Sequence, residues 1–268
     1  MYFSNLIQSS LNSNKYPPRR PKSNPLPIIY GRHPIETALK EKKSFEKILL
    51  LQSIRGAFEK KIRRYCKEQN IPLQMAPKER LNKITRKNHQ GIIGFVAIVL
   101  YQSLEDIVAV MYDCQTPLLV LLDGVTDVRN VGAIARSAEV CGANALILPK
   151  KGNAQINEEA IKTSAGALNT LPICRVGSLV TAIEYLKLSG VQVMVADLGG
   201  NQFLDEVDAT APLAIVVGAE DKGVSKEVLK RADTRFRIPM KGKTDSFNVS
   251  VVVGIALYEV LRQRRVPS

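Results

Sequence analysis

Short apolar runs alternate with amphipathic segments along the chain, and the alternation becomes regular after residue 117. PLLVLLDGV is apolar at successive positions, which is typical of a strand buried on both faces of a parallel sheet. The segment from Asn130 to Gly142 predicts a helix. Further strands are predicted at NALILP, VQVMVAD, LAIVVGAE and TRFRIPM, and helices at SLVTAIEYLKLSG and FNVSVVVGIALYEVLRQRR. This order predicts a parallel α/β domain over residues 117–268.

The part before residue 117 has a different organisation. Residues 1–25 are polar, proline-rich and basic, and predict a flexible tail. Residues 26–100 combine the predicted strands FEKILLLQ, IPLQMAP and GIIGFVAIVL with a basic helix at 57–70, which indicates a small α/β domain. Residues 101–116 predict a linker with one short helix.

Positive charge is concentrated in the first hundred residues, which hold 20 Lys and Arg against 6 Asp and Glu. The remaining residues hold 18 against 19, so the whole net charge of +13 comes from the first part. Such a block attracts polyanions, and RNA is the partner that it favours. A merely solvated basic surface and an anionic membrane surface are the alternatives for this block, and an organellar transit peptide is the alternative for residues 1–25.

Several classes of protein are disfavoured by what the sequence lacks. No apolar run approaches the roughly 20 residues that cross a bilayer. The four cysteines have no metal-ligand spacing and the two histidines lie far apart, which favours reduced thiols, a cytoplasmic location and no metal. GxGxxG and GxxxxGK[ST] are absent, which disfavours ordinary dinucleotide-binding and P-loop enzymes. Neither histidine lies after residue 117, so that domain has no Ser–His–Asp triad.

Three glycine-containing polar loops follow predicted strands: DGVTDVRN, GAEDKGVS and MKGKTDSFN. Ligands of parallel α/β domains bind at the carboxyl ends of the strands, so these loops are the candidate site. Arg136 is a second signal, because it is the only charge between Asn130 and Ala138 and an unpaired buried cation is costly.

These segments resemble the SpoU/TrmH-like branch of the SPOUT RNA methyltransferases. DGVTDVRNVGAIARSAEVCGA, IVVGAEDKGVS and IPMKGKTDSFNVSVVVGIALYE are similar to the three motifs of that family, in the same order. NHQGIIGFV, at 88–96, is similar to the end of the family's small RNA-binding domain. With this extra domain, the resemblance is closest to the members that methylate a guanosine of 23S ribosomal RNA.

The resemblance implies a trefoil knot in the parallel-sheet domain, S-adenosylmethionine as the cofactor, no metal, and a homodimer formed through the knot region. It implies a catalytic set made up of Arg136, Asn130, Glu220, Ser246 and Asn248. It implies a cofactor site made up of Ile215, Val217, Gly218, Ala219, Ile238, Met240, Ser246, Phe247 and Val249.

The chemistry of Arg136 leaves two roles open. An arginine stays charged in proteins, which favours binding of the ribose and the adjacent phosphate so that the pKa of the 2′-OH falls. Direct proton abstraction by a deprotonated Arg136 is the family's usual proposal.

Structural roles are the alternatives for the other residues. Asn130 is predicted to be both a site residue and an N-cap, and Asn248 and Ser250 are candidate caps of the last helix. Glu220 is alternatively a solvent-facing loop acid or a structural partner of an arginine. Val249, Val252 and Val253 offer apolar surface either to a second subunit or to the core of their own chain.

The predicted function is 2′-O-ribose methylation of large-subunit ribosomal RNA. Transfer RNA is the alternative substrate. A ribosome-assembly factor that binds RNA without catalysis is the alternative from another class.

Overall fold

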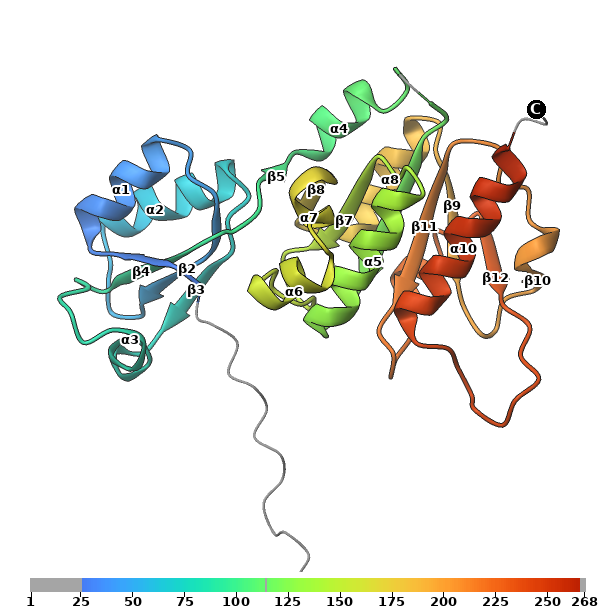
Figure 1. The fold of residues 1–268 in the computed structure, drawn as a ribbon. Coiled ribbons are helices and arrows are strands. Elements are labelled where there is room, and N and C mark those ends of the chain that lie inside the picture. The colour runs from blue at the N-terminus through green and yellow to red at the C-terminus, as the bar shows by residue number, and fades with distance from the viewer. Residues whose placement is uncertain (1–25, 114, 266–268) are drawn as a thin grey trace, which may run out of the picture.

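The computed structural model describes residues 26–113 and 115–265, which form two domains, each with its own β-sheet (Figure 1). The predicted basic tail at 1–25 lies outside the described residues. No helix in the two described ranges is both long and apolar enough to cross a membrane.

The N-terminal domain is built on a four-stranded mixed sheet in the order β1-β4-β2-β3. Its strands are β1 (Ile28–Tyr30), β2 (Phe45–Leu51), β3 (Leu73–Ala76) and β4 (Ile92–Val96). Its helices are α1 (Arg32–Lys40), α2 (Ala57–Glu68) and α3 (Lys78–Ile84). Side chains of α1 and α2 pack on one face of the sheet, and Leu81 of α3 packs on the other.

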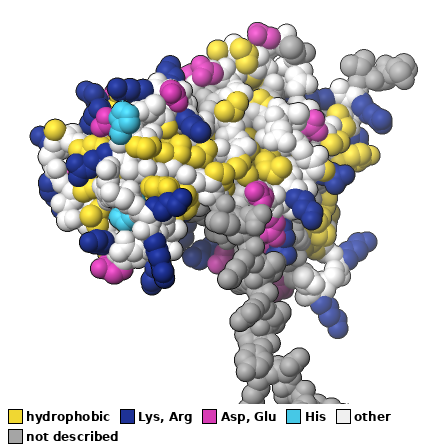
Figure 2. Space-filling model, turned by 60° about the vertical axis from the view of Figure 1, so that its left-hand side comes forward, with side chains coloured by type: hydrophobic (Ala, Val, Ile, Leu, Met, Phe, Trp, Pro, Cys, Tyr) yellow, Lys and Arg dark blue, Asp and Glu magenta, His cyan; other side chains and the backbone are white. Residues whose placement is uncertain are grey.

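Basic side chains lie on the outside of this small domain. In α2 only Ile62 and Cys66 are buried, so its lysines and arginines face outward. Burial raises the pKa of the Cys66 thiol to about 12, which keeps the thiol protonated at neutral pH. Figure 2 shows Lys and Arg side chains spread over this domain, as the charge asymmetry of the sequence predicted.

The C-terminal domain contains an eight-stranded parallel sheet in the order β10-β12-β9-β11-β6-β7-β8-β5. Its strands are β5 (Tyr101–Gln102), β6 (Leu118–Asp123), β7 (Ala145–Pro149), β8 (Ile173–Val176), β9 (Gln192–Ala196), β10 (Gln202–Phe203), β11 (Leu213–Gly218) and β12 (Thr234–Arg237). Its helices are α4 (Leu104–Val110), α5 (Val128–Val140), α6 (Glu158–Thr163), α7 (Ala167–Thr170), α8 (Leu179–Leu188), the 3-10 helix η1 (Leu204–Glu206), α9 (Lys226–Leu229) and α10 (Val249–Arg264). The predicted parallel α/β fold is confirmed; the trefoil knot stays a prediction.

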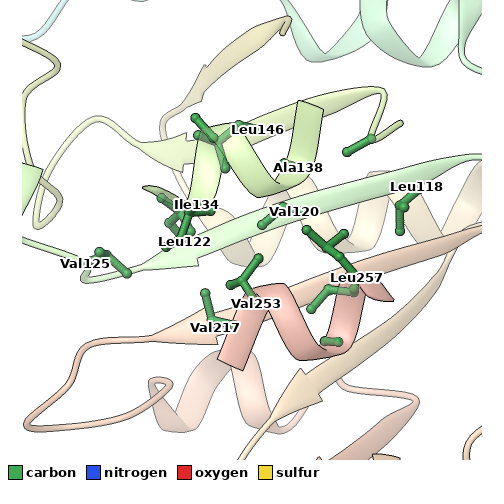
Figure 3. Close-up of a cluster of buried hydrophobic side chains, with 14 of the residues drawn as sticks. Leu118, Val120, Leu122, Val125, Ile134, Ala138, Leu146, Val217, Val253 and Leu257 are labelled. Atoms are coloured by element: carbon green, nitrogen blue, oxygen red, sulfur yellow. The ribbon is translucent and has the colours of Figure 1, made fainter. Parts of the chain in front are cut away.

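Helices cover both faces of the large sheet, which explains why its central strands carry apolar side chains at successive positions. Val120 and Leu122 of β6 face α5 and α10, whereas Leu119 and Leu121 face the layer of α4, α8 and α9. Figure 3 shows side chains of α5 and α10 gathered against β6. A strand that is covered on both faces loses the polar–apolar alternation of a half-exposed strand.

The C-terminal helix contributes to this core. Val249 and Val253 are buried in it. Of the two roles predicted for these valines, they therefore have the intramolecular one, in the core of their own chain. A different set of large apolar side chains on α10 is exposed: Val251, Tyr258 and Leu261.

The segment between the domains is more structured than a linker. Tyr101 and Gln102 pair with Ile173 and Cys174, which makes β5 an edge strand of the large sheet. The predicted short helix is α4, and its Leu104 and Ile107 are buried against that sheet. Within the run GIIGFVAIVL, strand β4 therefore ends at Val96, earlier than predicted. The chain enters the second domain at Tyr101.

A buried ion pair joins the two domains. Glu46 lies at a bulge in β2, where the pairing with β4 shifts register. The guanidinium of Arg175 in β8 donates to the Glu46 carboxylate at 2.6 Å and to the Glu46 carbonyl at 2.9 Å. Tyr101 donates to the same carboxylate at 2.7 Å, and the Arg175 guanidinium lies over the Tyr101 ring. Because a bulge interrupts the ladder, the carboxylate and the carbonyl of Glu46 are both available to the other domain.

We expect Arg175→Ala to lower the free energy of unfolding by about 3–5 kcal/mol, because it leaves a buried carboxylate without its cation. Side chains of both partners are almost fully buried, at 5% and 2% exposure. Urea denaturation measures the loss. Arg231→Ala is the matched control, since its pair with Glu184 is at the surface, and its expected cost is at most about 1 kcal/mol. Equal effects of the two substitutions would contradict the assigned role of Arg175.

Candidate functional site

The three polar loops predicted from the sequence meet at one edge of the large sheet. They follow β6, β11 and β12, whose carboxyl ends all point to that edge. A cavity of about 450 Å³ lies there, between the loops after β9, β11 and β12 and the start of α10. This is the position at which parallel α/β folds bind ligands.

Most of the predicted cofactor residues line this cavity. They are Val217, Gly218, Ala219, Ile238, Met240, Ser246, Phe247 and Val249. The exception is Ile215, which is fully buried in the core. Its side chain lies on the same face of β11 as Val217 but two positions earlier, below the strand end where the cavity opens.

One wall of the cavity is not among the residues predicted from the sequence. Ala196, Asp197 and Leu198, at the end of β9, line it as well. The Asp197 carboxylate accepts a hydrogen bond at 2.9 Å from Arg235 of β12. The sequence signal for this wall is Asp197, the acidic residue that ends the run VQVMVAD, because it directly follows a strand as the three polar loops do.

Gly218 allows the loop after β11 to fold back tightly. The Ala219 amide donates to the Gly223 carbonyl at 3.2 Å, and the Gly223 amide donates to the Ala219 carbonyl at 2.8 Å. A Cβ atom on Gly218 would lie 2.1 Å from the Gly223 carbonyl carbon and 2.2 Å from the Val224 amide nitrogen. Only glycine fits at this position, because the backbone of the returning loop occupies the space of a side chain.

The loop after β11 is also tied to the neighbouring strand. The Ser225 amide donates to the Asp123 carboxylate, at the end of β6, at 2.7 Å. The residues between Gly218 and Ser225 are therefore held at both ends beside the cavity.

A polar cluster from all three predicted loops lies next to the cavity. Glu220 accepts a hydrogen bond from the Asn130 side-chain amide at 2.5 Å and another from the Asn248 side-chain amide at 2.8 Å. The same Asn248 amide lies 3.3 Å from the Asn130 side-chain oxygen. Since the carboxylate holds two amides from other loops, the cluster fixes the relative position of the three loops.

The capping roles of the two asparagines differ. Asp127 is the N-cap of α5 and accepts from the Arg129 amide at 2.8 Å, so the predicted capping role of Asn130 is wrong. Asn130 lies in the first turn, and its side chain reaches Glu220 instead. Asn248 is the N-cap of α10, as the alternative interpretation held, and its oxygen accepts from the Ser250 amide at 2.9 Å. Asn248 therefore both caps a helix and contacts the cluster.

Arg136 stands apart from this cluster. Its side chain is exposed on the outer face of α5, while Ile134, Ala135 and Ala138 face the core. It has no hydrogen bond or ion pair with any residue in the described ranges. Arg136 lies six positions after Asn130, which amounts to about 9 Å along the helix axis and places it on a different face. The isolated charge in an apolar stretch thus lies on the solvent-facing side of α5, and its guanidinium is free to bind a ligand.

Two family models match this chain over the two domains. The SpoU rRNA Methylase family matches residues 117–258, and the model described as RNA 2′-O ribose methyltransferase substrate binding matches residues 28–102.

The relatives are named as RNA methyltransferases. A putative TrmH family tRNA/rRNA methyltransferase of Bacillus subtilis is 30% identical over 88% of this chain and 95% of its own length. An uncharacterized tRNA/rRNA methyltransferase of Synechocystis is 35% identical over 89% of this chain, which spans only 63% of that longer protein. Among solved structures, the SpoU methyltransferase AviRb of Streptomyces viridochromogenes, in complex with the cofactor AdoMet, has a TM-score of 0.57 at 23% identity, over 88% of this chain and 90% of its own. This last likeness concerns the fold.

Proposed function

This chain belongs to the SpoU rRNA methylase family, and on that premise we propose that it transfers the methyl group of S-adenosylmethionine to a ribose 2′-OH of large-subunit ribosomal RNA. The observation that carries the proposal is the contact of Glu220 with Asn130 and Asn248 beside the cavity, which joins the three family motifs in one site. The presence of a matching substrate-binding domain favours a ribose of RNA as the acceptor.

The residues of the cavity fit S-adenosylmethionine. Met240, Phe247 and Val249 supply apolar surface, and Gly218, Ala219 and Gly223 of the close turn line the cavity as well. Apolar side chains suit an adenine ring, and backbone groups can recognise its polar edge. The cofactor supplies an activated methyl group, so the protein has to position the 2′-OH and manage one proton.

The polar residues divide these tasks. Glu220, Asn130 and Asn248 hold the loops in register, and Ser246 lines the cavity beside Phe247. Arg136 supplies a free guanidinium that binds the ribose and its neighbouring phosphate. A fixed positive charge there stabilises the alkoxide that develops as the 2′-OH loses its proton.

A homodimer is part of the proposal. Val251, Tyr258 and Leu261 form an exposed apolar strip on α10, the helix whose N-terminal end borders the cavity. A second copy of the chain that covers this strip would lie close to the site. Sedimentation velocity measures the oligomeric state, and a monomer at working concentration would contradict the dimer.

Methyl transfer to RNA tests the function. The purified protein is incubated with methyl-labelled S-adenosylmethionine and with unmodified ribosomal RNA, transfer RNA or assembling ribosomal particles, and 2′-O-methyl positions are mapped. We expect label in ribosomal RNA at a ribose. Label only in transfer RNA would replace the substrate and keep the chemistry. Label on a base would overturn the 2′-O assignment. Absence of label in both RNAs and in assembling ribosomal particles would favour an assembly factor without catalysis.

A further inference from the structure

A second cavity, of about 210 Å³, lies between the two domains. Glu46 and Gln74 of the N-terminal sheet line one side of it. The loop 148–155 after β7, together with Arg175, lines the other side. The cavity is therefore bordered both by the domain that matches the substrate-binding model and by the domain that carries the candidate site.

Positive charge surrounds this cavity without matching acids. Lys150, Lys151 and Arg175 line it, and Lys47 lies beside it with its ammonium 3.0 Å from the Gln155 side-chain oxygen. Glu46 is the one carboxylate in the lining, and Arg175 already neutralises it. Within the described ranges, none of the three lysines forms an ion pair with an acid.

The pKa shifts of two of these lysines reflect the same excess of positive charge around the cavity. Burial lowers the pKa of Lys47, and the positive charge of Arg80 lowers it further. Burial also lowers the pKa of Lys150, with Arg175 as the second cause. Half-buried ammonium groups that repel neighbouring cations gain most from an added anion.

The loop that carries these lysines is fixed to the catalytic site. Asn153 donates to the Leu122 carbonyl at 3.1 Å and accepts from the Gly124 amide at 2.6 Å. The Ala154 amide donates to the Val125 carbonyl at 2.8 Å. The chain continues from Val125 through Asp127 into α5, so the loop of Lys150 and Lys151 is held in register with Asn130 and Arg136.

We propose that the cavity between the domains binds a backbone phosphate of the substrate RNA, with Lys150 and Lys151 as its ligands and Lys47 close by. This inference rests on the proposed function and names the second point at which the RNA is held. A phosphate bound there sets the spacing between the part of the RNA on the N-terminal domain and the nucleotide at the catalytic site. Lysines suit this task, because an ammonium binds phosphate as a point charge.

The test is the salt dependence of RNA binding by Lys150→Ala, Lys151→Ala and wild-type protein. Each phosphate contact that is lost should reduce the slope of log K against log salt by about 0.7–0.9. Lys230→Ala is the matched control, since Lys230 is an exposed lysine beside α9. This helix packs on the face of the large sheet opposite to α5 and α10. Asn70→Gly removes the 2.6 Å hydrogen bond of Lys150 and leaves its charge, so it should leave the slope unchanged.

The outcomes separate this inference from the function. A reduced slope for both lysine variants, with wild-type slopes for both controls, supports the site. Equal slopes for Lys151→Ala and Lys230→Ala would overturn it. Because Lys151 is exposed, the Lys151→Ala variant should fold normally. If inorganic phosphate binds to the wild type but not to Lys150→Ala while RNA binding is equal, the cavity takes a free anion and the RNA assignment fails. A lysine-dependent slope without any methyl transfer would retain the site and remove the proposed function.

Discussion

Replacing Gly218 with alanine should weaken the binding of S-adenosylmethionine by about 100-fold. The added Cβ would lie within 2.3 Å of three backbone atoms of Gly223 and Val224, so the loop has to move. Overpacking of this kind costs about 1–3 kcal/mol, and 1.4 kcal/mol corresponds to a factor of ten in affinity. Residues 220–223 are exposed, so the strain is relieved by displacement of the loop, which deforms the cavity that it lines.

Isothermal titration of the cofactor measures this effect. Gly177→Ala is the matched control, because a Cβ at Gly177 meets no atom within 4 Å and its backbone is not in the left-handed region. The control should bind the cofactor like the wild type. Unfolding by urea shows whether the Gly218 variant remains folded. A folded Gly218→Ala protein with wild-type affinity would exclude this cavity as the cofactor site.

Arg136→Ala should lower the rate of methyl transfer by about 10²- to 10³-fold, the usual cost of removing one group that stabilises developing negative charge. Cofactor affinity and the free energy of unfolding should both stay unchanged. The side chain is exposed and does not line the cavity. The effect would therefore fall on catalysis and RNA binding, and single-turnover rates at saturating RNA separate the two.

Two further variants test whether the effect is specific to Arg136 and to its guanidinium group. Arg129→Ala changes an equally exposed arginine of the same helix whose guanidinium already pairs with Asp127 at 2.9 Å, and it should change the rate by less than about tenfold. Arg136→Lys keeps the charge and loses the planar fork that binds ribose and phosphate together. A lysine variant with near-normal turnover would contradict the need for an arginine, because a positive charge alone would then suffice at this position.

Local sequence pattern determined the type and the order of the main elements. Continuous apolar runs predicted β6, β7, β9 and β11, because these strands are covered on both faces. Loop composition at strand ends located the candidate site, since parallel strands bring their carboxyl ends to one edge. Short elements such as β5 and β10, each two residues long, have no periodicity of their own and were not predicted.

Contacts between residues distant in the sequence were decided only by the tertiary structure. The sequence nominated Glu220, Asn130 and Asn248 one by one, but their hydrogen bonds span 90 and 28 positions, which no local pattern encodes. Arg136 shows the opposite case, because its apolar neighbours suggested burial while helix geometry turns it to solvent. The pairing of Arg175 with Glu46 depends on a β-bulge and on the docking of two domains, 129 positions apart in the chain. The sequence thus determined the elements and the candidate loops, while packing decided which of their side chains meet.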